Sequence, residues 1–172
     1  MPILDFSQSS PLTDGRQSER ALSIRRGVVR HFQELGFAMI AELALASGRR
    51  ADLIGMDRKG KFVIIEIKSS VEDFKVDQKW PEYLAHCDSY YFATHAGVPA
   101  EIFPTQEGLI VADNYGAEIL RPSQDYSMAG ATRKALTLRF ARAAADRLER
   151  VLSHYSNNGD TLPADLNDIS GQ

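Results

Sequence analysis

The stretch FVIIEIKSS, residues 62–70, begins as an apolar β-strand and then places two charged side chains within the apolar run. Such a run is typical of a strand that is buried on both faces in the middle of a sheet. Because side chains alternate along a strand, Glu66 and Lys68 lie on the same face. Burying an unpaired carboxylate or ammonium costs several kcal/mol, so we expect this pair to be ion-paired, solvated in a cleft or bound to a metal.

A second strand is expected just upstream, over residues 51–56, joined to the first by a turn at 57–60 (DRKG). Gly60 sets the length of this turn, because a three-residue loop that ends there gives glycine the left-handed conformation that such loops need. In this register Asp52 lies opposite Glu66 and shares its face. A two-residue loop would turn Asp52 to the other face, so Gly60 favours a site in which two carboxylates and an ammonium converge.

The rest of the chain predicts further helices and strands, separated by Gly and Pro residues. The expected elements are a helix at 17–35, strands at 37–45, 51–56 and 61–69, a helix from about residue 71, a turn or short helix at 81–87, strands at 88–95, 108–113 and 117–122, and a long amphipathic helix at 131–155. The order α-β-β-β-α-β-β-β-α predicts an α/β fold with a mixed sheet flanked by helices.

Composition is that of one soluble globular domain: 172 residues, 44% of them hydrophobic and 25% charged. The sequence has neither a run of about 18 apolar residues nor an export signal, so no membrane partner is expected. Cys87 is the only cysteine, which excludes an internal disulfide and suits a reducing compartment. Together these features predict a cytoplasmic protein.

The two ends of the chain differ from its middle. Residues 1–16 are rich in Ser, Gln, Pro and Asp and are expected to be disordered, and residues 157–172 are expected to form an acidic flexible tail. The folded domain is therefore expected over 17–156. The net charge of −3 does not by itself indicate a nucleic-acid partner, but the acidic tail conceals a roughly neutral body.

Two carboxylates beside an ammonium suit a phosphodiesterase that uses Mg²⁺ or Mn²⁺. Mg²⁺ prefers oxygen ligands, takes one or two carboxylates and keeps its other positions for water and phosphate. The metal polarises the phosphate and supplies hydroxide, while a lysine beside it offsets negative charge or helps to hold or deprotonate the water. The alternative is a cross-strand ion-pair network among Asp52, Glu66 and Lys68 that holds no metal.

Asp52 within ADLIG, followed by EIK at 66–68, resembles the motif of the PD-(D/E)xK nuclease superfamily. The longer run over 48–93, with its DQKWPEYL segment, and the later GLIVADNYGAEILR resemble MmcB-like bacterial DNA repair proteins. The resemblance covers about 37–122 and implies a restriction-endonuclease-like fold with an α-β-β-β-α-β core, and a role in DNA repair. Ala51 departs from the superfamily motif, which has proline at this position.

The resemblance also implies roles for individual residues. The metal ligands would be Asp52, Glu66 and the backbone carbonyl of Ile67. Lys68 would be the catalytic lysine, and Asp52 and Glu66 would take part in catalysis through the metal. Related nucleases often add an acidic residue from the first helix or strand, for which Glu42 is preferred to Glu34.

Four residues are candidates for contact with DNA. Arg49 and Arg50 stand beside the second strand, where a basic rim could bind phosphate, although a charged hairpin surface is the alternative. Gln78 resembles the glutamine that several exonuclease branches keep near the site, and Lys79 could take its place. For both of these residues the alternative is an exposed helix face.

Two functions remain open on this evidence. The first is a metal-dependent DNA endonuclease or exonuclease that acts in repair. The second is a catalytically silent nuclease-fold module that binds damaged or branched DNA, or a repair partner. The intact D…ExK set favours the first. A restriction enzyme is disfavoured, because 172 residues leave little room for a sequence-reading domain. Many small nucleases of this fold pair up, so a homodimer is a further expectation.

Overall fold

The computed structural model describes residues 18–159, which divide into two compact units between Met128 and Ala129. The predicted disordered segment 1–16 and most of the predicted acidic tail lie outside the described residues. The single domain over 17–156 stays a prediction. Among the described helices, none combines the length and the apolar character needed to cross a membrane.

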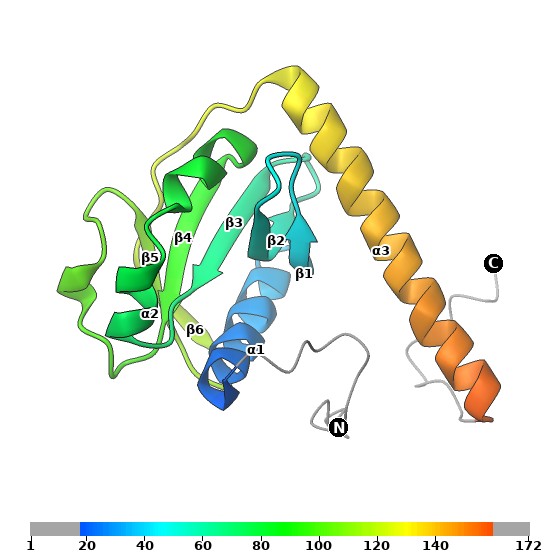
Figure 1. Cartoon of the computed structure of the whole chain (residues 1–172), viewed down its shortest axis with the longest axis horizontal. Coiled ribbons are helices and arrows are strands. Elements are labelled where there is room, and N and C mark those ends of the chain that lie inside the picture. The colour runs from blue at the N-terminus through cyan, green and yellow to red at the C-terminus, as the bar shows by residue number, and fades with distance from the viewer. Residues whose placement is uncertain (1–17, 160–172) are drawn as a thin grey trace. The chain divides into compact units, whose positions relative to one another are not determined.

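The first unit is built on a six-stranded sheet in which the strands lie in chain order (Figure 1). The strands are β1 (Ala38–Ala44), β2 (Arg50–Met56), β3 (Phe62–Ile67), β4 (Ser89–Thr94), β5 (Gly108–Ala112) and β6 (Ala117–Arg121). Strands β1 to β3 are antiparallel, β3 to β5 are parallel and β6 returns antiparallel. The predicted mixed sheet and α-β-β-β-α-β core of a restriction-endonuclease-like fold are therefore confirmed.

Helix α1 (Glu19–Glu34) covers one face of this sheet. The hydroxyl of Ser18 begins the helix by accepting the N–H of Ala21 at 3.1 Å. An apolar stripe of Ile24, Val28 and Phe32 then packs against the sheet. Its buried partners on the strands are Leu53, Val63, Ile65, Ile67, Ala93, Ile110 and Ala112.

The other face of β3 and β4 is covered by α2 (Val71–Val76) and η1 (Trp80–His86), with an aromatic cluster between them and the sheet. The short η2 (Ala100–Ile102) follows β4 in the chain. The cluster consists of Phe74, Trp80, Tyr83, Tyr90, Phe92 and Phe103. Phe92 is the register partner of Glu66, so Glu66 lies on this aromatic face.

The turn between β2 and β3 has the predicted length. Gly60 has φ +77°, the left-handed conformation, and the N–H of Asp57 donates to the carbonyl of Lys61 at 3.0 Å. The ladder pairs Met56 with Phe62 and continues along the hairpin to Leu53 and Ile65. The next position in this register sets Asp52 opposite Glu66, as the sequence predicts.

Helix α2 begins at the predicted residue but ends well before Pro81. At its start the hydroxyl of Ser70 accepts the N–H of Asp73 at 3.1 Å. At its end Asp77 has φ −105° and ψ 96°, an extended conformation that leaves the helix and leads into η1. The residue that ends the helix is therefore Asp77, and the proline lies within the next element.

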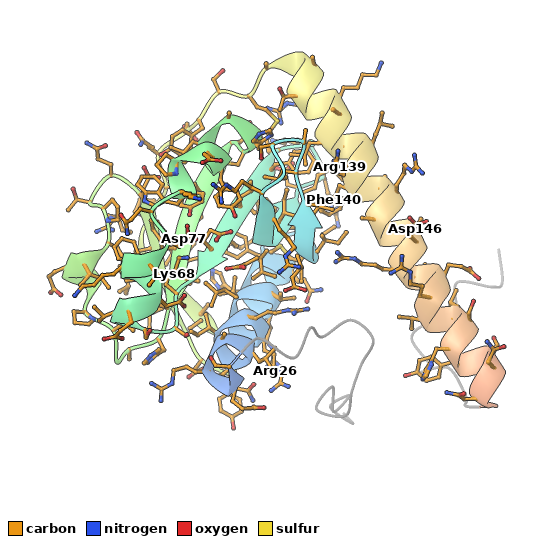
Figure 2. The ribbon with its side chains drawn as sticks, viewed as in Figure 1. Arg26, Lys68, Asp77, Arg139, Phe140 and Asp146 are labelled. Carbon is orange, nitrogen blue, oxygen red and sulfur yellow. The ribbon has the colours of Figure 1, made fainter. Side chains whose placement is uncertain are left out.

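The second unit contains α3 (Gly130–Asn158), a helix of 29 residues. It continues past the predicted end at residue 155 and is capped by Gly159, which has φ 68°. The helix carries more basic than acidic side chains. Its residues Arg139, Phe140 and Asp146 are labelled in Figure 2.

Candidate active site

Asp52 and Glu66 are joined by backbone hydrogen bonds at the carboxyl end of β3. The N–H of Asp52 donates to the Glu66 carboxylate at 3.1 Å. The Asp52 carboxylate in turn accepts the N–H of Ile67 at 2.9 Å. These two bonds hold both acidic side chains on one face of the β2–β3 hairpin, which is the arrangement that the turn length predicts.

Burial is the main reason why both acids are hard to ionise. It raises the pKa of Asp52, and it raises the pKa of Glu66 well above its usual range, with the negative charge of Asp52 adding to the effect on Glu66. Only 3% of Glu66 is exposed. The backbone hydrogen bonds and the positive charge of Lys68 act in the opposite direction, but they do not outweigh burial.

The ammonium of Lys68 pairs with Asp77 rather than with either of these acids. Lys68 and Asp77 are both labelled in Figure 2. Lys68 Nζ lies 2.9 Å from Asp77 Oδ2, and within residues 18–159 no ion pair joins it to Asp52 or Glu66. The ion-pair network of Asp52, Glu66 and Lys68 that the sequence leaves open is therefore absent from the described part of the chain.

The Lys68–Asp77 contact keeps both partners charged. Burial lowers the pKa of Lys68, but the hydrogen bond to Asp77 and the nearby negative charges outweigh it, so the pKa lies above its usual value. Burial likewise raises the pKa of Asp77, and the hydrogen bond and charge of Lys68 reverse this, so that pKa lies below its usual value.

These groups line a cavity of about 390 Å³. The lining residues are Ser18, Ala21, Arg50, Asp52, Glu66, Ile67, Lys68, Ser69, Asp73, Asp77 and Tyr83. Each of the two paired acids, Asp52 and Glu66, accepts its backbone hydrogen bond through one oxygen, and no described residue donates to the other oxygen. Neither of these second oxygens is among the buried side-chain atoms that lack a hydrogen-bond partner, so neither is fully buried. They therefore face the water-accessible space of the cavity.

Glu42 lies on β1 opposite Asp52 in the β1–β2 register, beside the site but outside the cavity lining. Its φ of 51° is a left-handed conformation that a residue other than glycine rarely adopts. Glu34 lies at the opposite end of α1 from Ser18, which lines the cavity. Across residues 18–159, no group of three or more His, Cys, Asp or Glu side chains is arranged to hold a metal ion. A ligand role for Glu42 stays a prediction.

Of the four residues predicted to contact DNA, Arg50 alone is in the cavity lining. Arg49 makes two hydrogen bonds of 2.8 and 2.9 Å to Glu82. Gln78 turns its amide back onto a carbonyl of α2 at 2.7 Å, because the helix ends just before it and leaves that carbonyl without a partner. Lys79 is exposed outside the cavity lining. The DNA contacts of these residues stay predictions.

The cavity also contains residues that the sequence did not indicate. Asp73 accepts the N–H of Ser69 at 3.0 Å, and the hydroxyl of Tyr83 donates to the carbonyl of Arg50 at 2.9 Å. Both of these contacts fix the backbone around the site. Asp77 stands next to Gln78 in the DQKWPEYL segment, but its contact with Lys68 depends on where α2 ends, which the sequence alone does not reveal.

A family model described as DNA repair protein MmcB-like matches residues 8–154. The chain belongs to the MmcB-like DNA repair protein family. The match includes all six strands and most of α3, and so extends well beyond the D…ExK segment. A comparison with curated proteins gives no match.

Two solved structures are similar to this chain. One is described as "SPO1766 protein of unknown function from Silicibacter pomeroyi"; it is 41% identical with a TM-score of 0.75, and the match covers 78% of this chain and 92% of that chain. The other is described as "crystal structure of a repair endonuclease from Pyrococcus abyssi"; it is 14% identical with a TM-score of 0.35, and the match covers 50% of this chain and 42% of that chain.

Proposed function

We propose that this protein is a metal-dependent DNA phosphodiesterase that acts in DNA repair through a PD-(D/E)xK-type site. The main support is that Asp52 and Glu66 share a cavity and form no ion pair with a described cation, since the nearby ammonium of Lys68 pairs with Asp77. Membership of the MmcB-like DNA repair protein family supports DNA as the partner. The proposed place of action is the cytoplasm, because the lone cysteine fits a reducing compartment.

The residues around the cavity fit a hard divalent cation. Two carboxylates each present an oxygen that accepts no hydrogen bond from the described residues, and burial makes their negative charge costly without a cation. Oxygen ligands of this kind suit Mg²⁺ or Mn²⁺, with the carbonyl of Ile67 as the further ligand. When bound, the ion would polarise the phosphate and lower the pKa of water.

The residues of the chain would divide the remaining work between them. Asp52 and Glu66 would bind the ion in a fixed geometry, because backbone hydrogen bonds hold both side chains. Lys68 would stabilise the negative charge that develops on the phosphate. Because its pKa is raised, Lys68 stays protonated at neutral pH and would act as a hydrogen-bond donor rather than as a base. Arg50, at the cavity, would contact a neighbouring phosphate.

Cleavage assays with the full chain test this proposal. The protein would be incubated with labelled single-stranded, nicked and branched DNA in Mg²⁺, in Mn²⁺ and in EDTA. We expect cleavage that requires the metal and falls by roughly 100-fold or more in Lys68→Ala and Asp52→Ala. Glu118→Gln, which removes an exposed acid on β6, should cleave like the wild type.

The second candidate is a silent nuclease-fold module that binds damaged or branched DNA, or a repair protein, and does not cut. The pairing of Lys68 with Asp77 favours it, because this contact occupies the ammonium that catalysis would use. DNA retained without cleavage, and equally well by Lys68→Ala and Asp52→Ala, would establish the module and overturn the nuclease. Dimerisation belongs to the same set of proposals and is tested by the mass of the protein in solution.

A further inference from the structure

Asp77 holds Lys68 through a carboxylate whose two oxygens both have partners. Oδ2 accepts the Lys68 ammonium at 2.9 Å, and Oδ1 accepts the N–H of Lys79 at 3.2 Å. The backbone hydrogen bond fixes the carboxylate at the junction of α2 and η1. Lys68 is therefore tethered to the side of the cavity formed by this junction.

Without that tether, the ammonium would face two other acidic side chains, Asp52 and Glu66, that line the same cavity. Lys68 is near enough to Glu66 and Asp52 for their charges to act on it, yet it forms no ion pair with them in the described residues. The Lys68 side chain is buried, but a four-carbon stem has enough rotatable bonds to re-aim the ammonium within the cavity. Released from Asp77, Lys68 would approach the uncompensated Asp52–Glu66 pair, and no other described cation makes an ion pair with those two acids.

We propose that Asp77 is a positioning residue that keeps the Lys68 ammonium off the Asp52–Glu66 pair and so leaves that pair free to bind a divalent cation. This inference rests on the proposed function, because it assumes that the pair binds a metal. In this arrangement Lys68 does not compete with the cation as long as Asp77 is present. Removing Asp77 makes Lys68 an internal competitor for the metal position.

A double-mutant cycle on metal affinity tests the inference without any activity assay. Mn²⁺ binding would be measured by calorimetry on the full-length wild type, Asp77→Asn, Lys68→Met and the double variant. We expect Lys68→Met to change the affinity less than twofold when Asp77 is present, and to raise it about tenfold in the Asp77→Asn background. Asp77→Glu should restore the affinity that Asp77→Asn loses, and Glu118→Gln is the control for the loss of one surface acid.

The double-mutant cycle distinguishes a lysine that Asp77 holds away from the metal position from two charges that act on the metal independently. If Asp77 and Lys68 act only as independent charges near the metal, Lys68→Met strengthens binding by the same factor in both backgrounds, and that result overturns the inference. Should Asp77→Asn fail to fold, the single variant still decides: a Lys68→Met protein that binds Mn²⁺ tenfold more tightly than the wild type contradicts a tethered lysine. A wild type that binds no Mn²⁺ overturns the proposed function and the inference with it, whereas a wild type that binds Mn²⁺ with an additive cycle overturns the inference alone.

Discussion

Asp52 lies opposite Glu66 on the β2–β3 hairpin and donates its own N–H to the Glu66 carboxylate at 3.1 Å. This hydrogen bond holds the two acids together at a buried position, since only 3% of Glu66 is exposed. Neutral backbone N–H groups orient both carboxylates but do not neutralise them. The metal-free protein therefore pays a free-energy cost at this site, which a proton or a divalent cation would relieve.

The first prediction concerns Glu66→Gln in metal-free protein. The amide keeps the shape of the side chain and can still accept the N–H of Asp52, but it carries no charge. We expect Glu66→Gln to raise the melting temperature in EDTA by roughly 2–5 °C. Mn²⁺ should raise the melting temperature of the wild type, because a ligand that binds only the folded state stabilises it, and should leave the variant unchanged.

Differential scanning calorimetry with and without Mn²⁺ measures both effects. Glu82→Gln is a suitable control, since Glu82 is an exposed acid on η1 whose removal deletes one surface pair with Arg49. Such pairs contribute about 0–1 kcal/mol. A Glu66→Gln protein that melts below the wild type in EDTA would show that the charge of Glu66 is compensated in the folded state.

The second prediction is that the stability of metal-free protein falls as the pH rises above about 4.3, the ordinary pKa of glutamate. The folded-state pKa of Glu66 lies well above its unfolded value, mainly because of burial, so the folded state holds the proton more tightly. The stabilising effect of this proton is complete at pH values below the unfolded-state pKa of Glu66, and it is lost as the pH rises through the folded-state pKa of Glu66. The lowered pKa of Asp77 acts oppositely, but its window lies at lower pH, below about 3.9.

Urea unfolding between pH 4 and pH 8 in EDTA measures this slope. Glu66→Gln should flatten it, and saturating Mn²⁺ should reduce it in the wild type, because the cation replaces the proton. Equal slopes for the wild type and the variant would show that Glu66 is not the group responsible.

The position of Asp52 was predictable and that of Asp77 was not, for a physical reason. The register of a hairpin is set by a local feature, the left-handed glycine at Gly60, which the sequence displays directly. The partner of Lys68 depends on the residue at which α2 stops, and a six-residue helix has no strong local signal for its end. The same early end redirects Gln78 onto the helix and exposes Lys79.

The left-handed backbone conformation of Glu42 was also not predictable from the sequence. Its place on β1 follows from the alternation of apolar residues, but its φ of 51° is a property of the assembled sheet. The element order, by contrast, was predictable throughout the described sheet, because apolar strands separated by Gly and Pro are local signals.

The third prediction concerns Cys87, which is fully buried and whose thiol has a pKa raised mainly by burial. The thiolate is the reactive form, so native protein at pH 8 should resist alkylation by iodoacetamide. Unfolding in urea should expose the thiol and allow complete modification. Mass spectrometry of the intact chain after timed exposure checks this, and rapid alkylation of native protein would contradict the buried position.

The last prediction concerns Gly27, in the middle of α1. An alanine in a helix is normally more stable than glycine by about 1 kcal/mol. At Gly27, however, an added Cβ would lie 2.2 Å from the carbonyl oxygen of Asp113 and 2.3 Å from that of Gly116, both in the turn between β5 and β6. Arg26 and Arg30, which lie on either side of Gly27 in the helix, donate hydrogen bonds to the same turn. Gly27→Ala must therefore push α1 and this turn apart.

We expect Gly27→Ala to destabilise the protein by about 1–3 kcal/mol, the usual cost of overpacking, despite its gain in helix propensity. Gly116→Ala is the matched control, since a Cβ at that position meets nothing within 4 Å. That variant should stay within about 0.5 kcal/mol of the wild type in chemical unfolding. Because the first turn of α1 lines the cavity through Ser18 and Ala21, Gly27→Ala should also weaken Mn²⁺ binding. A Gly27→Ala protein as stable as Gly116→Ala would mean that α1 does not approach the turn closely in solution.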